Sequence, residues 1–221
     1  MTILVYNNRT GQMERFERGL REPMPYANET LLVGEFRGSS QTQLMWTQVY
    51  AMDAWKQLRT AWGRPIYLPY AFRRIGEGGH ASQSQHYAGV AFDCAQNLSS
   101  AERAQLRAIA ERISLITYVE PAYLTPTWVH FDCRTLPPAC PTGGYPVQRR
   151  GSQGVYVCIL QDALNIATGA RLVIDGVFGL RTEDALLFFQ ATRGLTADGV
   201  VGCATWRTLT GVAVGAGLRE D

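Results

Sequence analysis

Residues 84–93 read Ser-Gln-His-Tyr-Ala-Gly-Val-Ala-Phe-Asp, a loop that carries an imidazole and continues into a short apolar strand ending on a carboxylate. Gly89 allows the backbone to turn closely between the two, because glycine adopts positive φ angles at little steric cost. We therefore expect His86 and Asp93 to reach the same cation. Their spacing of seven positions has no built-in helical geometry, so it is a weaker signal than paired Cys-x-x-Cys motifs.

A second segment, residues 127–132, reads Thr-Trp-Val-His-Phe-Asp. In a strand, alternate side chains share a face, so His130 and Asp132 should point to one side together with the tryptophan. The three histidines of the chain, His80, His86 and His130, all lie between positions 80 and 130. This concentration points to a common site.

Two imidazoles and one carboxylate, from His86, Asp93 and His130, are the ligand set of a catalytic zinc site, which keeps a fourth position open. Water in that position becomes a nucleophile near neutral pH and attacks a polarised carbonyl. The competing interpretation is that these histidines pack in a core beside aromatic residues and bind no metal. Spacing alone leaves both interpretations open.

The segments around this centre alternate between helical and extended patterns. Residues 43–62 carry apolar side chains close to helical spacing, and Gly63 and Pro65 end the pattern before a β-rich run at 66–72. A second helix should follow the capping box that Ser99 forms with the glutamate three positions later, with its apolar face made by Leu106, Ile109, Ala110 and Ile113.

Short apolar strands are expected on both sides of this second helix, at 90–94 and 128–132. Helices do not follow every strand, as they would in a wound parallel sheet. The order therefore predicts an α+β domain with a small, mostly antiparallel sheet.

Residues 136–146 read Leu-Pro-Pro-Ala-Cys-Pro-Thr-Gly-Gly-Tyr-Pro, with four prolines and two adjacent glycines. Such a composition continues neither a helix nor a central strand. It predicts a linker at 137–146 between a first domain, 1–136, and a second domain, 147–213.

The second domain contains an internal repeat. Residues 175–182, Asp-Gly-Val-Phe-Gly-Leu-Arg-Thr, recur at 198–205 as Asp-Gly-Val-Val-Gly-Cys-Ala-Thr. In each copy Asp-Gly should start a tight turn, and the threonine should cap a helix that begins directly after it. With helices expected at 182–193 and 205–209, and another around Val157–Leu164, the domain should be an all-α bundle of three short helices.

Composition excludes several classes of protein. The 21 basic and 19 acidic residues form no long run of one sign, which argues against a nucleic-acid partner. No segment approaches the roughly 18 apolar residues of a membrane span, and the N-terminus lacks the pattern of a secretory signal. Five cysteines are too few for a disulfide scaffold, so we expect scattered buried thiols, although Cys94 and Cys133 could pair. We expect a monomer.

The pattern around His86, Asp93 and His130 resembles the zinc D-alanyl-D-alanine carboxypeptidase and dipeptidase family, which shares its fold with hedgehog signalling domains and includes phage L-alanyl-D-glutamate endopeptidases. Residues 32–36 resemble the segment that opens that catalytic domain, and residues 70–73 resemble its strand ending in a substrate-binding arginine. The resemblance covers roughly residues 30–134.

The resemblance implies that the two histidines and the aspartate hold one catalytic zinc ion. It also implies that Arg73 faces the substrate carboxylate or the oxyanion, for which the fixed donors of a guanidinium are suited. Arg74 is the rival for that role, and Ser84 is expected to orient the loop.

One departure from the family concerns the general base. Many members have an acidic residue three positions before the last histidine, where this chain has Thr127, which cannot take a proton. Asp132 is the first candidate, although a role in holding an imidazole is equally expected of it. Glu120 and His80 are the other candidates.

The second domain resembles the three-helix peptidoglycan-binding domain of cell-wall hydrolases, through its two repeat copies and the pairs Phe189-Gln190 and Thr205-Trp206. Together the two resemblances imply a zinc-dependent peptidase that cuts an amide bond in the wall's stem peptide or cross-link and is anchored by its C-terminal domain. The alternative is a catalytically silent wall-binding protein that keeps the peptidase fold. In the absence of a visible signal, the enzyme would reach the wall as a phage-type endolysin or by another export route.

Overall fold

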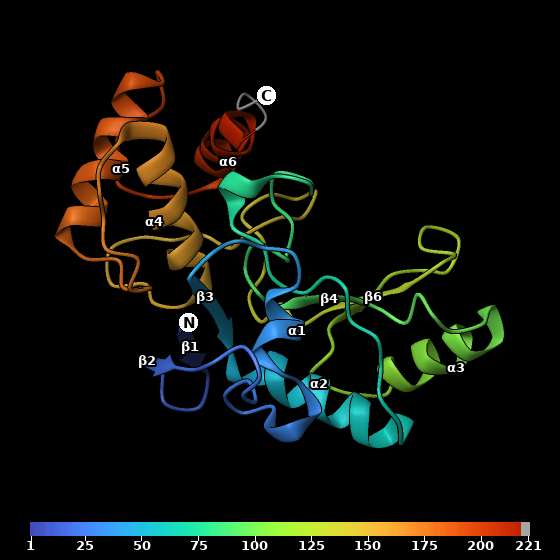
Figure 1. Cartoon of the computed structure of the whole chain (residues 1–221). Coiled ribbons are helices and arrows are strands. Elements are labelled where there is room, and N and C mark those ends of the chain that lie inside the picture. Colours follow the sequence, from blue (N-terminus) through green and yellow to red (C-terminus); the bar gives the residue numbers. More distant parts are fainter. Residues whose placement is uncertain (218–221) are drawn as a thin grey trace.

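The computed structural model describes residues 1–217 and contains two small three-stranded sheets, with helices around them (Figure 1). The strands are β1 (Thr2–Asn7), β2 (Gln12–Glu17), β3 (Leu44–Gln48), β4 (Ala91–Cys94), β5 (Tyr118–Val119) and β6 (Val129–Asp132). The helices are α1 (Val33–Arg37), α2 (Val49–Trp62), α3 (Ser100–Ala110), α4 (Val155–Thr168), α5 (Leu180–Thr192) and α6 (Cys203–Gly217), with short 3-10 turns η1 (Asn28–Thr30) and η2 (Ile75–Glu77).

The two sheets have different topologies. The first has the order β2-β1-β3, in which β1 pairs antiparallel with β2 and parallel with β3, and the second is antiparallel with the order β4-β6-β5. The expected α+β class with a mostly antiparallel sheet is confirmed. The N-terminal hairpin and its parallel partner β3 were not predicted. They form a second sheet in addition to the expected antiparallel one.

The helix expected over residues 43–62 is wrong in its first six positions. Leu44–Gln48 form β3, which pairs with β1 in the register Ile3↔Met45, and the helix begins at Val49. A short apolar run fits the helical and the extended period equally well, so its assignment depends on whether a partner strand is available. Here β1 provides that partner.

Two other local expectations have different outcomes. Residues 66–72 follow an irregular path and meet β4 through a bridge between Tyr70 and Asp93, because Pro65 directly before the run and Pro69 within it lack the N–H that strand pairing needs. The capping box before α3 is confirmed: the N–H of Glu102 donates to Ser99 Oγ at 3.3 Å, and the Glu102 carboxylate accepts from the N–H of Ser99. The helix ends before Ile113, which was expected on its face.

Helices α4, α5 and α6 form the expected C-terminal bundle, but the threonine caps are wrong. Helices α5 and α6 begin two residues earlier than predicted, and Thr182 and Thr205 lie in their first turns. Each threonine hydroxyl instead accepts a hydrogen bond from a buried glutamine amide, Gln161 or Gln190, at 3.3 Å. The repeat is therefore a turn built around a buried glutamine.

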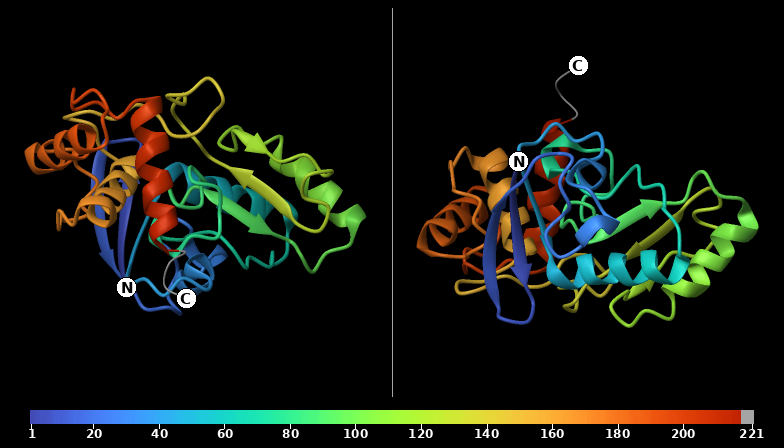
Figure 2. Two further views of the ribbon diagram at one scale, coloured as in Figure 1. Left: turned by 90° about the horizontal axis from the view of Figure 1, so that it is seen from above. Right: turned by 60° about the horizontal axis from the view of Figure 1, so that its bottom comes forward.

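The two halves of the chain pack closely together. In both views of Figure 2 the orange helix α4 stands beside the blue hairpin of β1 and β2. The α4 helix contacts β3 and η2, and α6 also contacts η2. The N-cap of α4, Gly154, lies against the ring of Tyr6, where an added Cβ would be 3.4 Å from the nearest ring atom. The boundary expected at 137–146 remains a prediction.

A disulfide bond joins Cys140 in the proline-rich segment to Cys203 at the start of α6. The expectation of scattered buried thiols is therefore wrong for these two cysteines. The pairing considered for Cys94 and Cys133 is also wrong: both are free and buried, as is Cys158, within the described part of the chain. Sequence separation of 63 residues hides the true pair from any local pattern. In residues 1–217, none of the helices is long and apolar enough to cross a membrane.

Candidate metal centre

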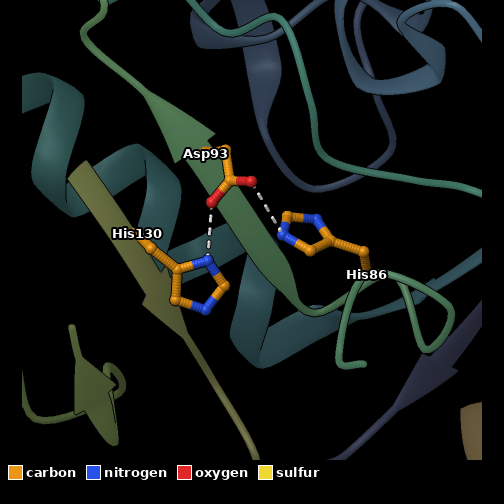
Figure 3. A group of neighbouring side chains, drawn as sticks. All are labelled: His86, Asp93 and His130. Carbon is orange, nitrogen blue, oxygen red and sulfur yellow. Dashed lines mark hydrogen bonds and ion pairs between the residues drawn. The ribbon is translucent and has the colours of Figure 1, made fainter. Parts of the chain in front are cut away.

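Strands β4 and β6 bring two of the three expected ligands together. Asp93 and His130 are directly opposite each other in the antiparallel register, so their side chains point to the same face of the sheet. His130 Nδ1 lies 2.6 Å from Asp93 Oδ1, and His86 Nε2 lies 3.2 Å from Asp93 Oδ2 (Figure 3). One ligand atom from each of the three residues lies within 4.8 Å of the others.

The loop that carries His86 depends on Gly89, as expected. Gly89 has a φ of +65°, and a Cβ atom there would lie 2.0 Å from the carbonyl oxygen of Trp46. The Trp46 indole donates to the carbonyl of Tyr87 at 2.8 Å, and the Thr47 hydroxyl donates to that of Gly89 at 2.7 Å. Strand β3 thus holds the loop through contacts that only a glycine permits.

The hydrogen bonds of His86 determine which of its ring nitrogens is available. Its Nδ1 lies 3.0 Å from the carbonyl oxygen of Ala71, which can only accept, so Nδ1 carries the proton. The unprotonated Nε2 faces the Asp93 carboxylate and is buried without a hydrogen-bond partner among residues 1–217. Two electron-pair donors that face each other in a buried position are stabilised by a cation that both can bind, so these residues fit a zinc ion.

Strong electrostatic coupling accompanies this geometry. Burial raises the pKa of Asp93, but the hydrogen bond from His130 and the nearby His86 ring outweigh it and hold that pKa well below the usual range. Burial lowers the pKa of His130, while the carboxylates of Asp132 and Asp93 raise it to about 9. In the metal-free protein His130 therefore holds a proton near neutral pH, which a metal ion would have to displace.

Asp132 lies close to His130 and is completely buried. Its Oδ1 accepts a hydrogen bond from Arg134 Nε at 2.7 Å, its Oδ2 is paired with the same guanidinium, and Oδ2 lies 3.9 Å from His130 Nε2. This carboxylate is already neutralised and far from solvent. Arg134 was not predicted from the sequence. It lies two positions after Asp132 and so continues the alternation that places His130 and Asp132 on one face of the strand.

A pocket of about 490 Å³ opens beside Asp93. It is lined by Tyr70, Arg73, Gly79, His80, Asp93, Gln96 and Trp128. Two of the expected catalytic residues, Arg73 and His80, are therefore brought to the same pocket. Tyr70, Gln96 and Trp128 were not predicted to line it; Tyr70 and Trp128 lie next to motif residues, whereas nothing in the sequence singles out Gln96.

The two adjacent arginines have different surroundings. Arg73 lines the pocket, and its guanidinium donates to Ser39 Oγ at 2.9 Å. Arg74 points to the C-terminal bundle, where its Nε donates to Asp162 Oδ2 at 2.7 Å and its Nη2 pairs with the other carboxylate oxygen. Only Arg73 is therefore free to meet a ligand in the pocket.

The remaining candidates for a general base differ in position. His80 stacks on His86 with 4.5 Å between ring centroids, and burial together with the nearby His86 lowers its pKa to about 4. Glu120 follows β5, where its N–H donates to the His130 carbonyl, and it is not among the residues that line the pocket. Thr127, which stands where many family members have an acidic residue, is exposed. Ser84, which was expected to orient the loop, accepts a hydrogen bond through its hydroxyl from the N–H of His86 at 3.3 Å.

Comparison with known proteins assigns both halves of the chain. Residues 23–132 match the Peptidase M15 family, and residues 153–209 match a peptidoglycan binding domain. The chain therefore contains a Peptidase M15 domain followed by a peptidoglycan-binding domain, and both resemblances noted in the sequence are confirmed.

A zinc D-Ala-D-Ala carboxypeptidase from Streptomyces albus G is 50% identical over 63 residues, which cover 27% of this chain and 24% of that relative. The match thus spans about a quarter of the length of the curated relative. A crystal structure of a peptidoglycan-binding protein from Clostridioides difficile, in complex with glutamine hydroxamate, is 39% identical over 30% of this chain and 42% of that one, with a TM-score of 0.29.

Proposed function

We propose that this protein is a zinc-dependent peptidoglycan peptidase that hydrolyses an amide bond in the stem peptide or the cross-link of the wall. The buried, unpartnered Nε2 of His86, aimed at Asp93 beside His130, is the observation that supports it best. His86, Asp93 and His130 would hold the ion. When bound, zinc would polarise the scissile carbonyl and lower the pKa of the attacking water.

The side chains around the pocket would bind and orient the substrate. Arg73 would bind a substrate carboxylate or the oxygen that gains charge during hydrolysis, using donors already held in place by Ser39. Asp132 would act through His130, whose ring it fixes and whose basicity it raises, because its own oxygens are committed to Arg134.

His80 would accept the proton in place of the acidic residue that Thr127 replaces. Its low pKa keeps the imidazole neutral at pH 7, and it lines the same pocket as Arg73. Glu120 remains the second candidate, because its backbone bond to His130 keeps it near the centre.

The C-terminal domain would hold the enzyme on its insoluble substrate and so raise the local concentration of peptide bonds. We propose the division into a catalytic domain at 1–136, a linker at 137–146 and a binding domain at 147–213. The site of action would be the bacterial cell wall, reached by endolysin-like release or another export route, and the protein would act as a monomer without membrane insertion.

The test combines metal analysis with turnover. The purified chain should contain one zinc ion and release amino groups from purified peptidoglycan, and mass spectrometry of the fragments would identify the bond. His86→Ala should lose both zinc and activity. Bound zinc without any released amino groups would leave the enzyme hypothesis without support.

The alternative is a catalytically silent wall-binding protein, which Thr127 and the complete burial of Asp132 favour. It predicts co-sedimentation with purified wall, one bound zinc and no turnover at any pH. A chain with packed histidines and no metal function would instead contain no zinc, and His86→Ala would then leave metal content unchanged.

A further inference from the structure

Tyr145, in the segment before the C-terminal bundle, holds the loop that leads to His86. Its backbone N–H donates to Gln83 Oε1 at 3.0 Å, and its hydroxyl donates to the carbonyl oxygen of Ser84 at 2.7 Å. Two consecutive residues of the loop are therefore fixed by one tyrosine from beyond the peptidase domain.

Tyr156, in the first turn of α4, holds the next residue. Its hydroxyl donates to Gln85 Oε1 at 2.9 Å, and both side chains are buried. The Gln85 carbonyl in turn accepts from the N–H groups of Ala88 and Val90, which close the turn around His86. Residues 83, 84 and 85 thus each accept a hydrogen bond from the C-terminal part of the chain, directly before the ligand.

Tyr145 is itself held in place by the C-terminal bundle. The ring of Tyr145 is fully buried and packs edge-on against Trp206 of α6, with 5.1 Å between ring centroids. The Trp206 indole donates to the Pro146 carbonyl at 2.8 Å, and the Cys140–Cys203 disulfide joins the same segment to α6. The bundle therefore provides a fixed support for the loop.

The opposite side of the loop is held by β3, through the bonds of Trp46 and Thr47 to the loop carbonyls. Those two bonds go to the carbonyls of Tyr87 and Gly89, which follow His86, whereas the tyrosine bonds hold the residues that precede it. The position of Nε2 relative to Asp93 depends on both sides, since small displacements of a ligand weaken metal binding strongly.

We propose that Tyr145 and Tyr156 are positioning residues of the metal centre, so that the C-terminal domain completes the zinc site in addition to binding the wall. This inference rests on the proposed zinc function. It assigns the bundle a role that a simple anchor does not have: its removal or displacement should change the metal centre itself.

The experiment measures metal binding by the full-length chain with both hydroxyls removed, Tyr145→Phe together with Tyr156→Phe. Competition with a chromogenic chelator should show zinc affinity weakened by roughly 10- to 100-fold, the range typical of groups that orient metal ligands. The visible absorption spectrum of the Co²⁺-substituted chain should change in shape. Tyr123→Phe, at an 81% exposed position, is the matched control and should match the wild type in both measurements.

Three further measurements separate the outcomes. Far-UV circular dichroism and sedimentation with purified wall should be unchanged in the double variant. Each single variant should give an intermediate zinc affinity. If the double variant failed to fold, the zinc affinities of the single variants would decide the question. Wild-type zinc affinity and an unchanged Co²⁺ spectrum in the folded variants would overturn the positioning role while leaving the zinc function intact. A wild-type chain that binds neither metal would overturn the proposed function and this inference together.

Discussion

At the scale of single residues, the centre is defined by which atoms already have partners. The Ala71 carbonyl accepts a hydrogen bond from the Nδ1–H of His86, so the unprotonated Nε2 faces Asp93. Arg134 is paired with both oxygens of Asp132, which leaves this carboxylate to act only through His130. Arg73 and Arg74 are adjacent in sequence, yet only Arg73 remains free for the pocket.

Zinc binding should be coupled to proton release at His130. Its pKa of about 9 in the metal-free protein means that at pH 7 a proton must leave when zinc binds, so the affinity should fall about tenfold for each pH unit below 9. The same raised pKa stabilises the metal-free fold below pH 6.5, and this stabilisation is lost as pH rises through 9.

Calorimetry in two buffers of different ionisation enthalpy should show about one proton released per zinc at pH 7. Asp132→Asn removes the carboxylate that raises the pKa of His130 and should reduce the number released. An unchanged proton count in that folded variant would contradict the assignment.

Gly89→Ala should destabilise the protein and abolish zinc binding. The new Cβ would clash with the Trp46 carbonyl and would also place an alanine at positive φ, for a combined cost of about 3 kcal/mol or more. Gly63→Ala is the control, because Gly63 has a similar φ of +75° with open space around it. Urea unfolding should show that Gly63→Ala lowers the free energy of unfolding by only about 1 kcal/mol. Equal losses in the two variants would argue against the close approach of Gly89 to the Trp46 carbonyl.

At the scale of elements, the C-terminal bundle is built from two copies of one turn. Gln161 and Gln190 are buried, and each amide group donates to an aspartate and a threonine of its own repeat copy while its oxygen accepts from the glycine N–H. The sequence repeat thus corresponds to a repeated hydrogen-bond network, and the threonine of each network lies in the first turn of the following helix.

Replacing Gln190 by methionine should lower the free energy of unfolding by about 2 to 3 kcal/mol. The substitution keeps the volume but leaves the buried N–H of Gly199 without its acceptor. Urea denaturation followed by circular dichroism would measure the loss. Gln105→Met on the exposed face of α3 should change stability by less than about 0.5 kcal/mol, and a similar small effect at Gln190 would contradict the network's importance.

At the scale of the whole molecule, the peptidase and wall-binding halves share contacts that a flexible anchor would lack. The Arg74–Asp162 ion pair joins the segment after Arg73 to α4, and the tyrosine bonds join the His86 loop to the same bundle. The two halves should therefore unfold together rather than as independent units.

Breaking the ion pair with Asp162→Asn should cost about 3 kcal/mol, because Arg74 is largely buried and would lose its counter-charge. Thermal unfolding should remain a single transition at a lower temperature. A double-mutant cycle with Arg74→Gln should show that the second substitution costs much less in the Asp162→Asn background. Purely additive losses would show that the pair does not couple the halves.

Local patterns in the chain were sufficient for the Gly89 turn, the capped helix α3 and the repeat of the bundle, because each depends on residues close together in sequence. The ligand set came from the resemblance to a known family and stays a prediction, which the proximity of His86, Asp93 and His130 supports. The first sheet escaped prediction, since β3 is a strand only when β1 pairs with it across some 40 positions. Tertiary contacts also decided three other features: the Cys140–Cys203 pair, the separate surroundings of Arg73 and Arg74, and the hydrogen bonds of Tyr145 and Tyr156 to the His86 loop. Each is a contact between segments far apart in the chain, and no periodicity or spacing encodes which distant partner a side chain will meet.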